Sequence, residues 1–340
     1  MTGGLDLSAL RVLLREHGVE TDGELTATPL SGGRSNLTFK VSDGTSTWVA
    51  RRPPLAGLTP SAHDVAREYR VTQALQVTPV PTAKTVALDA DGSVMGVPLS
   101  VVEYVSGTAI RSQDDLAALT DADIAKVTRS LVGALVTLHA VDHLELGLGD
   151  FGRPTGFVAR QVNLWSRQWQ RVRLTDHPDV ERLARLLADR VPAGGDTAVL
   201  HGDFRIDNTL LDVGDAAPVR AVVDWEMSTL GDPLTDVALM CVYRTPAFDA
   251  VLGIPAAWTS PRLPDADSLA ESYARGSGRD LADWDFYQAL GYFKIAVIAE
   301  GIAHRARTSG VAEHSGHRAA EAVPELVSAG LTALRPAHHG

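Results

Sequence analysis

Apolar and polar positions follow two different periods along the chain. In the first hundred residues, apolar and polar positions alternate in short runs, and a period of two predicts β-strands. One helical stretch, residues 62–76, separates the third strand from the fourth, and turn signals lie at 31–36 and at Asp89–Gly92. The predicted strands cover residues 25–30, 37–41, 47–52, 84–89 and 97–105.

Beyond about residue 110 the period becomes that of helices, with apolar side chains at every third or fourth position. The change of period predicts an α+β protein with two lobes. A small lobe of antiparallel strands and one helix would comprise residues 1–105, and a larger, mainly helical lobe residues 106–340. The predicted helices of the larger lobe cover 122–139, 156–173, 178–190, 233–244, 266–276, 285–306 and 317–333, with a β-rich interruption at 198–224.

Composition and charge exclude several classes of protein. Of 340 residues, 45% are hydrophobic and 21% charged, which is typical of a soluble globular protein. The net charge of −11 argues against a nucleic-acid binder or a basic membrane-surface protein. The single cysteine, Cys241, permits no disulfide within the chain. We find no secretory signal and no apolar run of about 20 residues, so we expect no membrane partner and a cytoplasmic location.

The polar residues with the clearest chemical meaning lie in segment 198–236. An apolar run ends at Leu200 and continues into His201-Gly202-Asp203, Asn208 follows, and a later apolar run ends at Asp224. Short strands around these turns would bring Asp203, Asn208 and Asp224 to one side of a hairpin. Carboxylate and amide oxygens suit Mg²⁺, so Asn208 and Asp224 are candidate metal ligands. Asp203 would then orient a hydroxyl group and accept its proton.

These motifs resemble those of a known family. His201-Gly202-Asp203-x-x-x-x-Asn208, followed by Asp224-Trp225-Glu226, resembles the catalytic segment of the aminoglycoside phosphotransferase and choline kinase group. Residues 224–236 are most similar to the phosphotransferase domain found with some acyl-CoA dehydrogenases. The resemblance covers about residues 25–310. It implies a protein-kinase-like fold, the use of ATP and Mg²⁺, and a small-molecule acceptor.

The resemblance also implies roles for individual residues. It implies that Asp203 is the catalytic base and that Asn208 and Asp224 are the Mg²⁺ ligands. Backbone groups of Glu103 and Val105, in the hinge between the lobes, would meet the adenine. The loop over the ATP phosphates, whose mostly small side chains let backbone N–H groups approach them, would comprise Ser31, Gly32, Gly33, Ser35 and Asn36.

The third predicted strand departs from the protein-kinase pattern, which has a lysine there. This strand reads Trp48-Val49-Ala50-Arg51, and strand alternation places Arg51 on the same face as Val49. We expect Val49 to line the adenine pocket and Arg51 to hold the phosphates, because arginine binds phosphate through two parallel hydrogen bonds. Lys40 is the alternative cation. The resemblance implies Glu68 as the carboxylate that anchors the basic residue.

In the related fold the acceptor lies between the catalytic loop and a helical segment, here residues 157–173. This segment is basic and aromatic, which disfavours a cationic aminoglycoside and favours a neutral or anionic acceptor such as a hydroxyacid or hydroxyacyl thioester. About equally favoured is the alternative that its tryptophans form part of the core. The candidate acceptor contacts are Arg160, Trp165, Trp169, His304 and Arg305.

The sequence therefore predicts an ATP- and Mg²⁺-dependent phosphotransferase that phosphorylates a hydroxyl group of a small molecule. The alternatives are an aminoglycoside- or macrolide-type antibiotic kinase, a nucleotide-binding module without activity, and a metal-dependent hydrolase that uses Asp203, Asp207 and Asp224. Three supporting roles are also predicted: His201 packs within its loop, Asp232 caps a helix, and Asp236 braces the catalytic loop.

Overall fold

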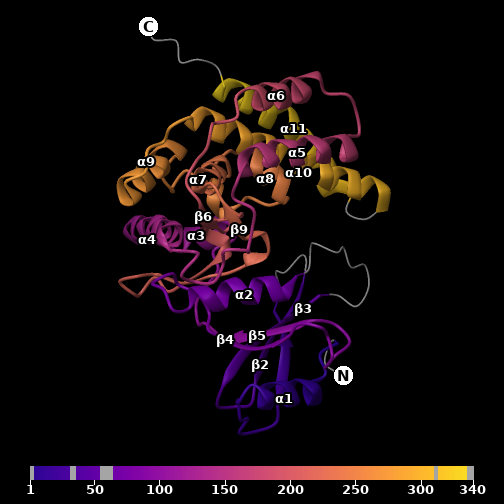
Figure 1. Ribbon diagram of the computed structural model, residues 1–340, viewed down its shortest axis with the longest axis vertical. Coiled ribbons are helices and arrows are strands. Elements are labelled where there is room, and N and C mark those ends of the chain that lie inside the picture. The colour runs from indigo at the N-terminus through magenta and orange to yellow at the C-terminus, as the bar shows by residue number, and fades with distance from the viewer. Residues whose placement is uncertain (1–3, 31–35, 54–63, 310–312, 335–340) are drawn as a thin grey trace.

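The first lobe is built on a five-stranded antiparallel sheet (Figure 1). The computed structural model describes residues 4–30, 36–53, 64–309 and 313–334. The strand order is β1-β2-β3-β5-β4, and the strands are β1 (Thr26–Pro29), β2 (Leu37–Ser42), β3 (Thr47–Arg52), β4 (Thr85–Asp89) and β5 (Leu99–Glu103). All five strands were predicted. Strands β4 and β5 form the predicted hairpin, but its connection is longer than the turn predicted at Asp89–Gly92, because β5 begins only at Leu99. The Asp89 carboxylate accepts hydrogen bonds from the Ser93 and Val94 N–H groups and stabilises this wider loop.

Alternation along the strands gives this sheet two different faces. One face is apolar and packs against α1 (Leu7–Glu16), a helix that was not predicted and that begins at its cap Asp6. The other face carries Val49 and Arg51 of β3, opposite Val102 and Ser100 of β5. Helix α2 (Val65–Leu75) lies between the sheet and the second lobe (Figure 1). The buried side chains of the apolar face include Phe39, Val41, Trp48, Ala50 and Val101.

The second lobe is mainly helical, as predicted. Each of the seven helices predicted beyond residue 110 is present with its ends shifted by a few residues, and α3 and α8 are additional. The helices are α3 (Gln113–Ala117), α4 (Asp121–Ala140), α5 (Phe157–Val172), α6 (Pro178–Asp189), α7 (Pro233–Val242), α8 (Ala247–Leu252), α9 (Ala266–Ser277), α10 (Trp284–Ser309) and α11 (Glu313–Ala333). None of the helices in the described part of the chain has the length and apolar character needed to cross a membrane.

Two short antiparallel pairs interrupt these helices. Strand β6 (Ala198–Leu200) pairs with β9 (Thr229–Gly231), and β7 (Thr209–Leu211) pairs with β8 (Val219–Val222). Single 3₁₀ turns, η1 (Ile206–Asn208) and η2 (Trp225–Met227), occupy the connections, and a third, η3 (Ala257–Thr259), follows α8. The β-rich interruption was predicted, although β9 extends it beyond residue 224. The turn η2, which directly follows Asp224, packs against α2.

The hydrophobic core is divided between the lobes in an unequal way. The apolar face of the sheet and α1 form one cluster. The helices of the second lobe form the other, and this second cluster also includes Val71 and Leu75 of α2 and Val80 of the following loop. Helix α2 therefore belongs to the first lobe by sequence and packs into the core of the second lobe.

Candidate active site

The turn after β6 is held rigidly by hydrogen bonds to its backbone. Gly202 has a φ of 85°, and a Cβ at this position would lie 2.5 Å from the Met227 carbonyl oxygen, so the turn requires glycine. The Asp236 carboxylate of α7 accepts hydrogen bonds from the N–H groups of His201 at 2.6 Å and Gly202 at 2.8 Å. Asp236 thus braces the turn after β6, and Asp232 caps α7, as predicted for both residues.

The buried imidazole of His201 connects this turn to the end of β8. Its Nδ1 accepts a hydrogen bond from the Asp203 N–H at 3.2 Å, so Nε2 carries the proton and donates to the Val223 carbonyl at 3.0 Å. The ring also lies 4.8 Å from the Trp225 ring, measured between centroids. The prediction of a packed, hydrogen-bonded histidine is confirmed. Because Val223 precedes Asp224, His201 fixes Asp203 and Asp224 relative to each other.

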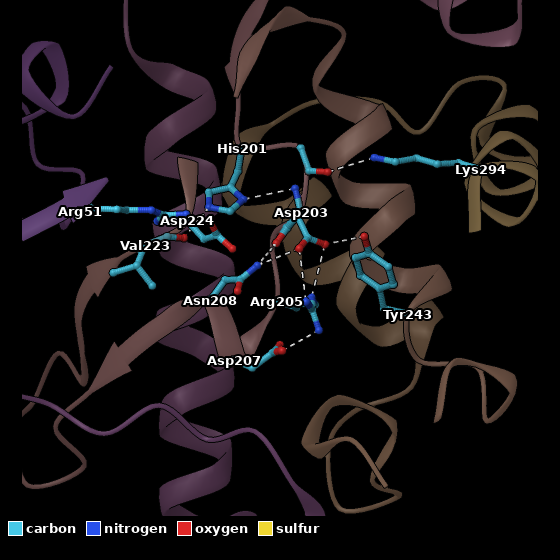
Figure 2. A network of polar contacts seen from close by, with 11 residues as sticks. Arg51, His201, Asp203, Arg205, Asp207, Asn208, Val223, Asp224, Tyr243 and Lys294 are labelled. Carbon is cyan, nitrogen blue, oxygen red and sulfur yellow. Dashed lines mark hydrogen bonds and ion pairs between the residues drawn. The ribbon is translucent and has the colours of Figure 1, made fainter. Parts of the chain in front are cut away.

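Four hydrogen bonds hold the Asp203 carboxylate (Figure 2). Asn208 donates to Oδ2 at 2.9 Å and Tyr243 to Oδ1 at 2.5 Å, from opposite sides. Arg205 donates through Nε to Oδ1 and through Nη2 to Oδ2, each at 3.3 Å. The side chain is still 24% exposed, so it can contact a bound molecule. Burial alone would raise the pKa of Asp203, but Arg205, Tyr243 and Lys294 together hold it below its ordinary value.

The strand arginine lies among carboxylates from both lobes. Arg51 contacts Glu68 of α2 at 3.3 Å and Asp224, after β8, at 2.9 Å. Burial raises the pKa of Glu68 to about 7, although Arg51 acts in the opposite direction. Lys40, the alternative cation, lies 4.3 Å from the centroid of the Tyr104 ring. The structure thus brings Arg51 together with the carboxylate that the resemblance implied.

The donor atoms around Asp224 fit a divalent cation. Glu68, Asp224 and Glu226 each offer an oxygen within 4.8 Å of one another, and Arg51 is the cation that pairs with them among the described residues. The cluster therefore carries an excess of negative charge. Asp224 has a φ of 67°, in the left-handed region that residues other than glycine seldom adopt. Because the Asn208 Nδ2 donates to Asp203, the amide oxygen faces away from Asp203. Hard oxygen donors of this kind are those that Mg²⁺ prefers.

The nucleotide-binding predictions are tested unevenly by the geometry. Ser31, Gly32, Gly33 and Ser35 lie outside the described residues, while Asn36 is buried at the start of β2. Val49 lies on the same face as Arg51, as strand alternation predicted. The Glu103 N–H donates to the Lys84 carbonyl at 2.8 Å, so any contact of Glu103 with a base would use its carbonyl. Val105 lies two residues beyond the end of β5 and is half-buried.

Among the acceptor predictions on α5 and α10, the one for Trp169 needs correction, and the others stay predictions. Trp169 is only 2% exposed and packs in the core, so its assignment to an acceptor surface was wrong. Arg160 donates to the Arg153 and Thr155 carbonyls and stabilises the start of α5. His304 bonds to the Val172 carbonyl at 3.1 Å and joins α10 to α5. Arg305 is exposed on α10. Helical spacing placed the two tryptophans on one face and could not show that this face meets the core.

Trp165 is the exception, because it lies beside a cation that contacts the catalytic turn. Lys294 of α10 lies 5.6 Å from the centroid of the Trp165 ring, and its Nζ donates to the Gly202 carbonyl at 3.0 Å (Figure 2). Burial lowers the pKa of Lys294, while Asp203 and Asp236 act to raise it. Both side chains are half-buried. They place a lysine and an aromatic ring side by side next to Gly202.

Three residues of this site were not predicted. Tyr243 follows α7 and lies two helical turns beyond Asp236, which places both on one face of the helix; this spacing was an available signal. Arg205 is separated from Asp203 by one residue, and its role depends on the 3₁₀ turn that follows. Lys294 interrupts an apolar helix in a chain with only four lysines, which marks it as unusual.

The antiparallel first lobe carries Arg51 and Glu68, and the helical second lobe carries Asp203, Asn208 and Asp224. This arrangement defines a two-lobed, protein-kinase-like fold and confirms the predicted fold class. The chain belongs to the phosphotransferase enzyme family, whose model matches residues 26–290.

The curated relatives are longer proteins. The chain is 31% identical to acyl-CoA dehydrogenase family member 11 of Mus musculus over 336 residues, which cover 96% of this chain and 43% of that protein. It is 32% identical to family member 10 of Mus musculus, over 91% of this chain and 29% of that protein. The chain therefore spans less than half the length of these relatives, in agreement with the predicted resemblance.

Solved structures confirm the fold. An aminoglycoside phosphotransferase candidate from Ralstonia eutropha has a TM-score of 0.82 and 30% identity, covering 96% of this chain and 98% of that one. A thermostable mutant of the aminoglycoside phosphotransferase APH(4)-Ia, in a ternary complex with AMP-PNP and hygromycin B, has a TM-score of 0.60 and 17% identity, covering 96% and 99%. At that identity, the second structure shows the shared fold alone.

Proposed function

We propose that this protein transfers the γ-phosphoryl group of ATP to a hydroxyl group of a small molecule, with Mg²⁺ as cofactor and Asp203 as the catalytic base. One observation carries the proposal: an ionised, partly exposed Asp203 is bonded to Asn208 and lies beside the ion pair that Arg51 of the first lobe forms with Asp224 of the second (Figure 2). A base, a metal-type donor set and a phosphate-binding cation are the parts that phosphoryl transfer needs.

The first lobe would bind the nucleotide. Val49, the Glu103 carbonyl and Val105 would meet the base, and the Arg51 guanidinium would hold the phosphates. Glu68 keeps Arg51 extended over the site through their 3.3 Å contact. Asp224 and Asn208 would hold Mg²⁺, which when bound offsets the negative charge of the phosphates.

The second lobe would position the acceptor. Its hydroxyl group would donate a hydrogen bond to the Asp203 carboxylate, which orients the oxygen toward the γ-phosphorus. As the new oxygen–phosphorus bond forms and the bond to ADP breaks, the hydroxyl proton passes to Asp203. The products are the phosphorylated acceptor and ADP, and Asp203 returns its proton to water.

For the acceptor we propose a hydroxyacid or hydroxyacyl thioester. The Lys294 ammonium group beside Gly202 and the adjacent Trp165 ring support an anionic or apolar acceptor better than a polycationic one. The similarity to proteins named acyl-CoA dehydrogenases supports the same class. An antibiotic kinase is the second candidate, favoured by the structural similarity to a candidate aminoglycoside phosphotransferase at 30% identity.

The test is ADP release from Mg·ATP across an acceptor panel. The panel would contain hydroxyacids, hydroxyacyl-CoA thioesters, sugars, choline, aminoglycosides and macrolides. We expect release only with acceptors of the first two classes. Asp203→Asn should lose at least about 100-fold in kcat while retaining ATP binding, because general-base catalysis contributes about 10²–10⁴-fold.

The matched control is Asp215→Asn, which changes a surface aspartate paired with Arg220. It should leave the kinetics unchanged. Full turnover by Asp203→Asn would refute Asp203 as the base. ATP binding by the wild type without ADP release for any acceptor would favour a nucleotide-binding module, and turnover of aminoglycosides or macrolides alone would favour an antibiotic kinase.

A further inference from the structure

The Asp203 carboxylate has more hydrogen-bond donors around it than a reacting base can keep. Tyr243 and Arg205 donate to Oδ1, and Asn208 and Arg205 donate to Oδ2. An ionised carboxylate offers about four lone-pair sites, and these four hydrogen bonds occupy them. An acceptor hydroxyl group can therefore bond to Asp203 only after one of the donors has left.

The donors differ in how readily they can leave. Both hydrogen bonds from Arg205 are 3.3 Å long, and Arg205 has a second partner in Asp207 at 2.5 Å. Arg205 can release Asp203 and keep an ion pair. The Tyr243 hydroxyl bonds at 2.5 Å, the residue is 4% exposed, and its ring packs against Phe248 with 4.4 Å between centroids.

We propose that Tyr243 is a positioning residue for phosphoryl transfer, which fixes Oδ1 of Asp203 while the acceptor hydroxyl takes the place of Arg205. Tyr243 holds one carboxylate oxygen and Asn208 the other, so the carboxylate cannot rotate when Arg205 leaves (Figure 2). Tyr243 keeps its proton and does not touch the acceptor. This role rests on the proposed function.

The experiment compares two tyrosines that lose the same kind of bond. Tyr287 is 3% exposed, and its hydroxyl donates to Asp232 at 2.6 Å, away from the catalytic turn. Tyr243→Phe and Tyr287→Phe each remove one buried hydroxyl–carboxylate hydrogen bond without changing the ring. Thermal unfolding, ATP binding and steady-state kinetics would be measured for both variants with Mg·ATP and the acceptor that the wild type uses best.

We expect Tyr243→Phe to lower kcat about 10- to 100-fold, because a small misplacement of a base has effects of this size. Its KM and binding constant for ATP should stay within about twofold, because Arg51 and Asp224 are untouched. Tyr287→Phe should lose similar thermal stability and keep kcat within about twofold.

The outcomes separate the two proposals. Unchanged kcat in Tyr243→Phe beside an active wild type would overturn the positioning role and leave the proposed function standing. An equal loss of kcat in Tyr287→Phe would also overturn it, because the effect would then follow from stability. If the wild type binds ATP but none of the acceptors causes it to release ADP, the proposed function is overturned, and the role of Tyr243 with it.

Discussion

Asp203 and Asp207 share one guanidinium, that of Arg205, and yet their environments move their pKa values in opposite directions. The pKa of Asp203 lies below its ordinary value because hydrogen bonds and nearby cations outweigh its burial. Burial raises the pKa of Asp207 to about 6, and the 2.5 Å contact with Arg205 does not offset it. Asp203 is thus ionised at neutral pH, while Asp207 titrates near pH 6.

The Asp207 carboxylate should make stability depend on pH. Its pKa is 3.8 unfolded and about 6 folded, so between these values the folded state binds more protons and stability falls as pH rises. In the wild type, the free energy of unfolding should therefore fall by about 1–3 kcal/mol between pH 4 and pH 6 because of Asp207, and in Asp207→Asn this fall should be absent. Chemical unfolding over this range measures it.

The control for this prediction is Asp215→Asn. The Asp215 carboxylate pairs with Arg220 at the surface, and hydrogen bonding to the Ala217 N–H lowers its pKa despite the opposing effect of desolvation. The Asp215 carboxylate therefore stabilises the folded protein at higher pH, in contrast to Asp207, and this stabilisation is lost as the pH falls through its folded pKa. Parallel pH profiles for Asp207→Asn and the wild type would contradict the assignment.

Gly202 should tolerate alanine less well than a glycine with the same backbone conformation. Gly202 and Gly253 have φ values of 85° and 82°, but a Cβ at Gly202 would lie 2.5 Å from the Met227 carbonyl oxygen, whereas nothing lies within 4 Å of one at Gly253. We expect Gly253→Ala to cost about 1 kcal/mol of unfolding free energy and Gly202→Ala several kcal/mol, with loss of activity. Denaturant titration measures both costs, and similar values would contradict a steric role for Met227.

At the scale of elements, α2 connects the two lobes. It carries Glu68, which contacts Arg51 on the face of the sheet turned away from α1. The neighbouring Arg67 donates to the carbonyls of Phe151 and Ser228, and its guanidinium carbon lies 3.9 Å from the centroid of the Phe151 ring. Helix α2 is therefore fixed to the second lobe by the residue next to the one that holds Arg51.

Removal of Arg67 should loosen this connection. We expect Arg67→Met to weaken ATP binding about three- to tenfold, because a mobile α2 holds Glu68 and Arg51 less firmly. The upper limit of the effect is the about 1.5–3 kcal/mol that a lost hydrogen bond to a charged group costs. Titration calorimetry measures the change. Arg70→Met is the comparison, because Arg70 also joins α2 to the second lobe but does so through exposed contacts with Asp150 and the Gly147 carbonyl. Equal effects of the two variants would exclude a specific role for Arg67.

The elements and the central acidic residues were predictable because their signals are local. Each strand and long helix shows its own period. Asn208 and Asp224 stand next to the ends of short apolar runs, and Asp203 stands three residues after the end of another. A polar residue close to the end of a buried strand lies in the turn at the rim of the hairpin, where it can stay in contact with solvent.

The partners contributed by distant helices were not predictable in this way. Trp169 and Trp165 have the same spacing signal, yet one is in the core and the other lies beside Lys294. Tyr243 follows a nearly all-buried helix, in which an aromatic residue is expected to be core. Their roles depend on how α5, α7 and α10 pack around the turn after β6, and this packing is not a local property of the sequence.

At the scale of the whole molecule, the proposed ATP site is assembled from both lobes. Arg51 comes from β3 of the first lobe, and Asp224 and Asn208 come from the second. A ligand that contacts both walls stabilises their arrangement as well as each lobe. Stabilisation by nucleotide should therefore depend on the metal-binding residues of the second lobe.

Mg·ATP at about 100 times its dissociation constant should add about 2.7 kcal/mol of stability. Asp224→Asn, or excess EDTA with the wild type, should remove most of this gain, because the phosphates then lose their contact with the second lobe. Thermal unfolding with and without nucleotide measures the effect. A shift that is the same in EDTA as in Mg²⁺ would show that the metal does not take part in binding.

The packing of α2 has a consequence for folding during synthesis on the ribosome. Val71, Leu75 and Val80 leave the ribosome early, but the core that buries them contains residues as late as Leu230 and beyond. At roughly 5–20 residues per second, this apolar surface waits on the order of ten seconds for its partners. A nascent chain stalled within that interval, or an expressed fragment that ends near residue 105, should bind chaperones and aggregate, even though its sheet and α1 have a core of their own.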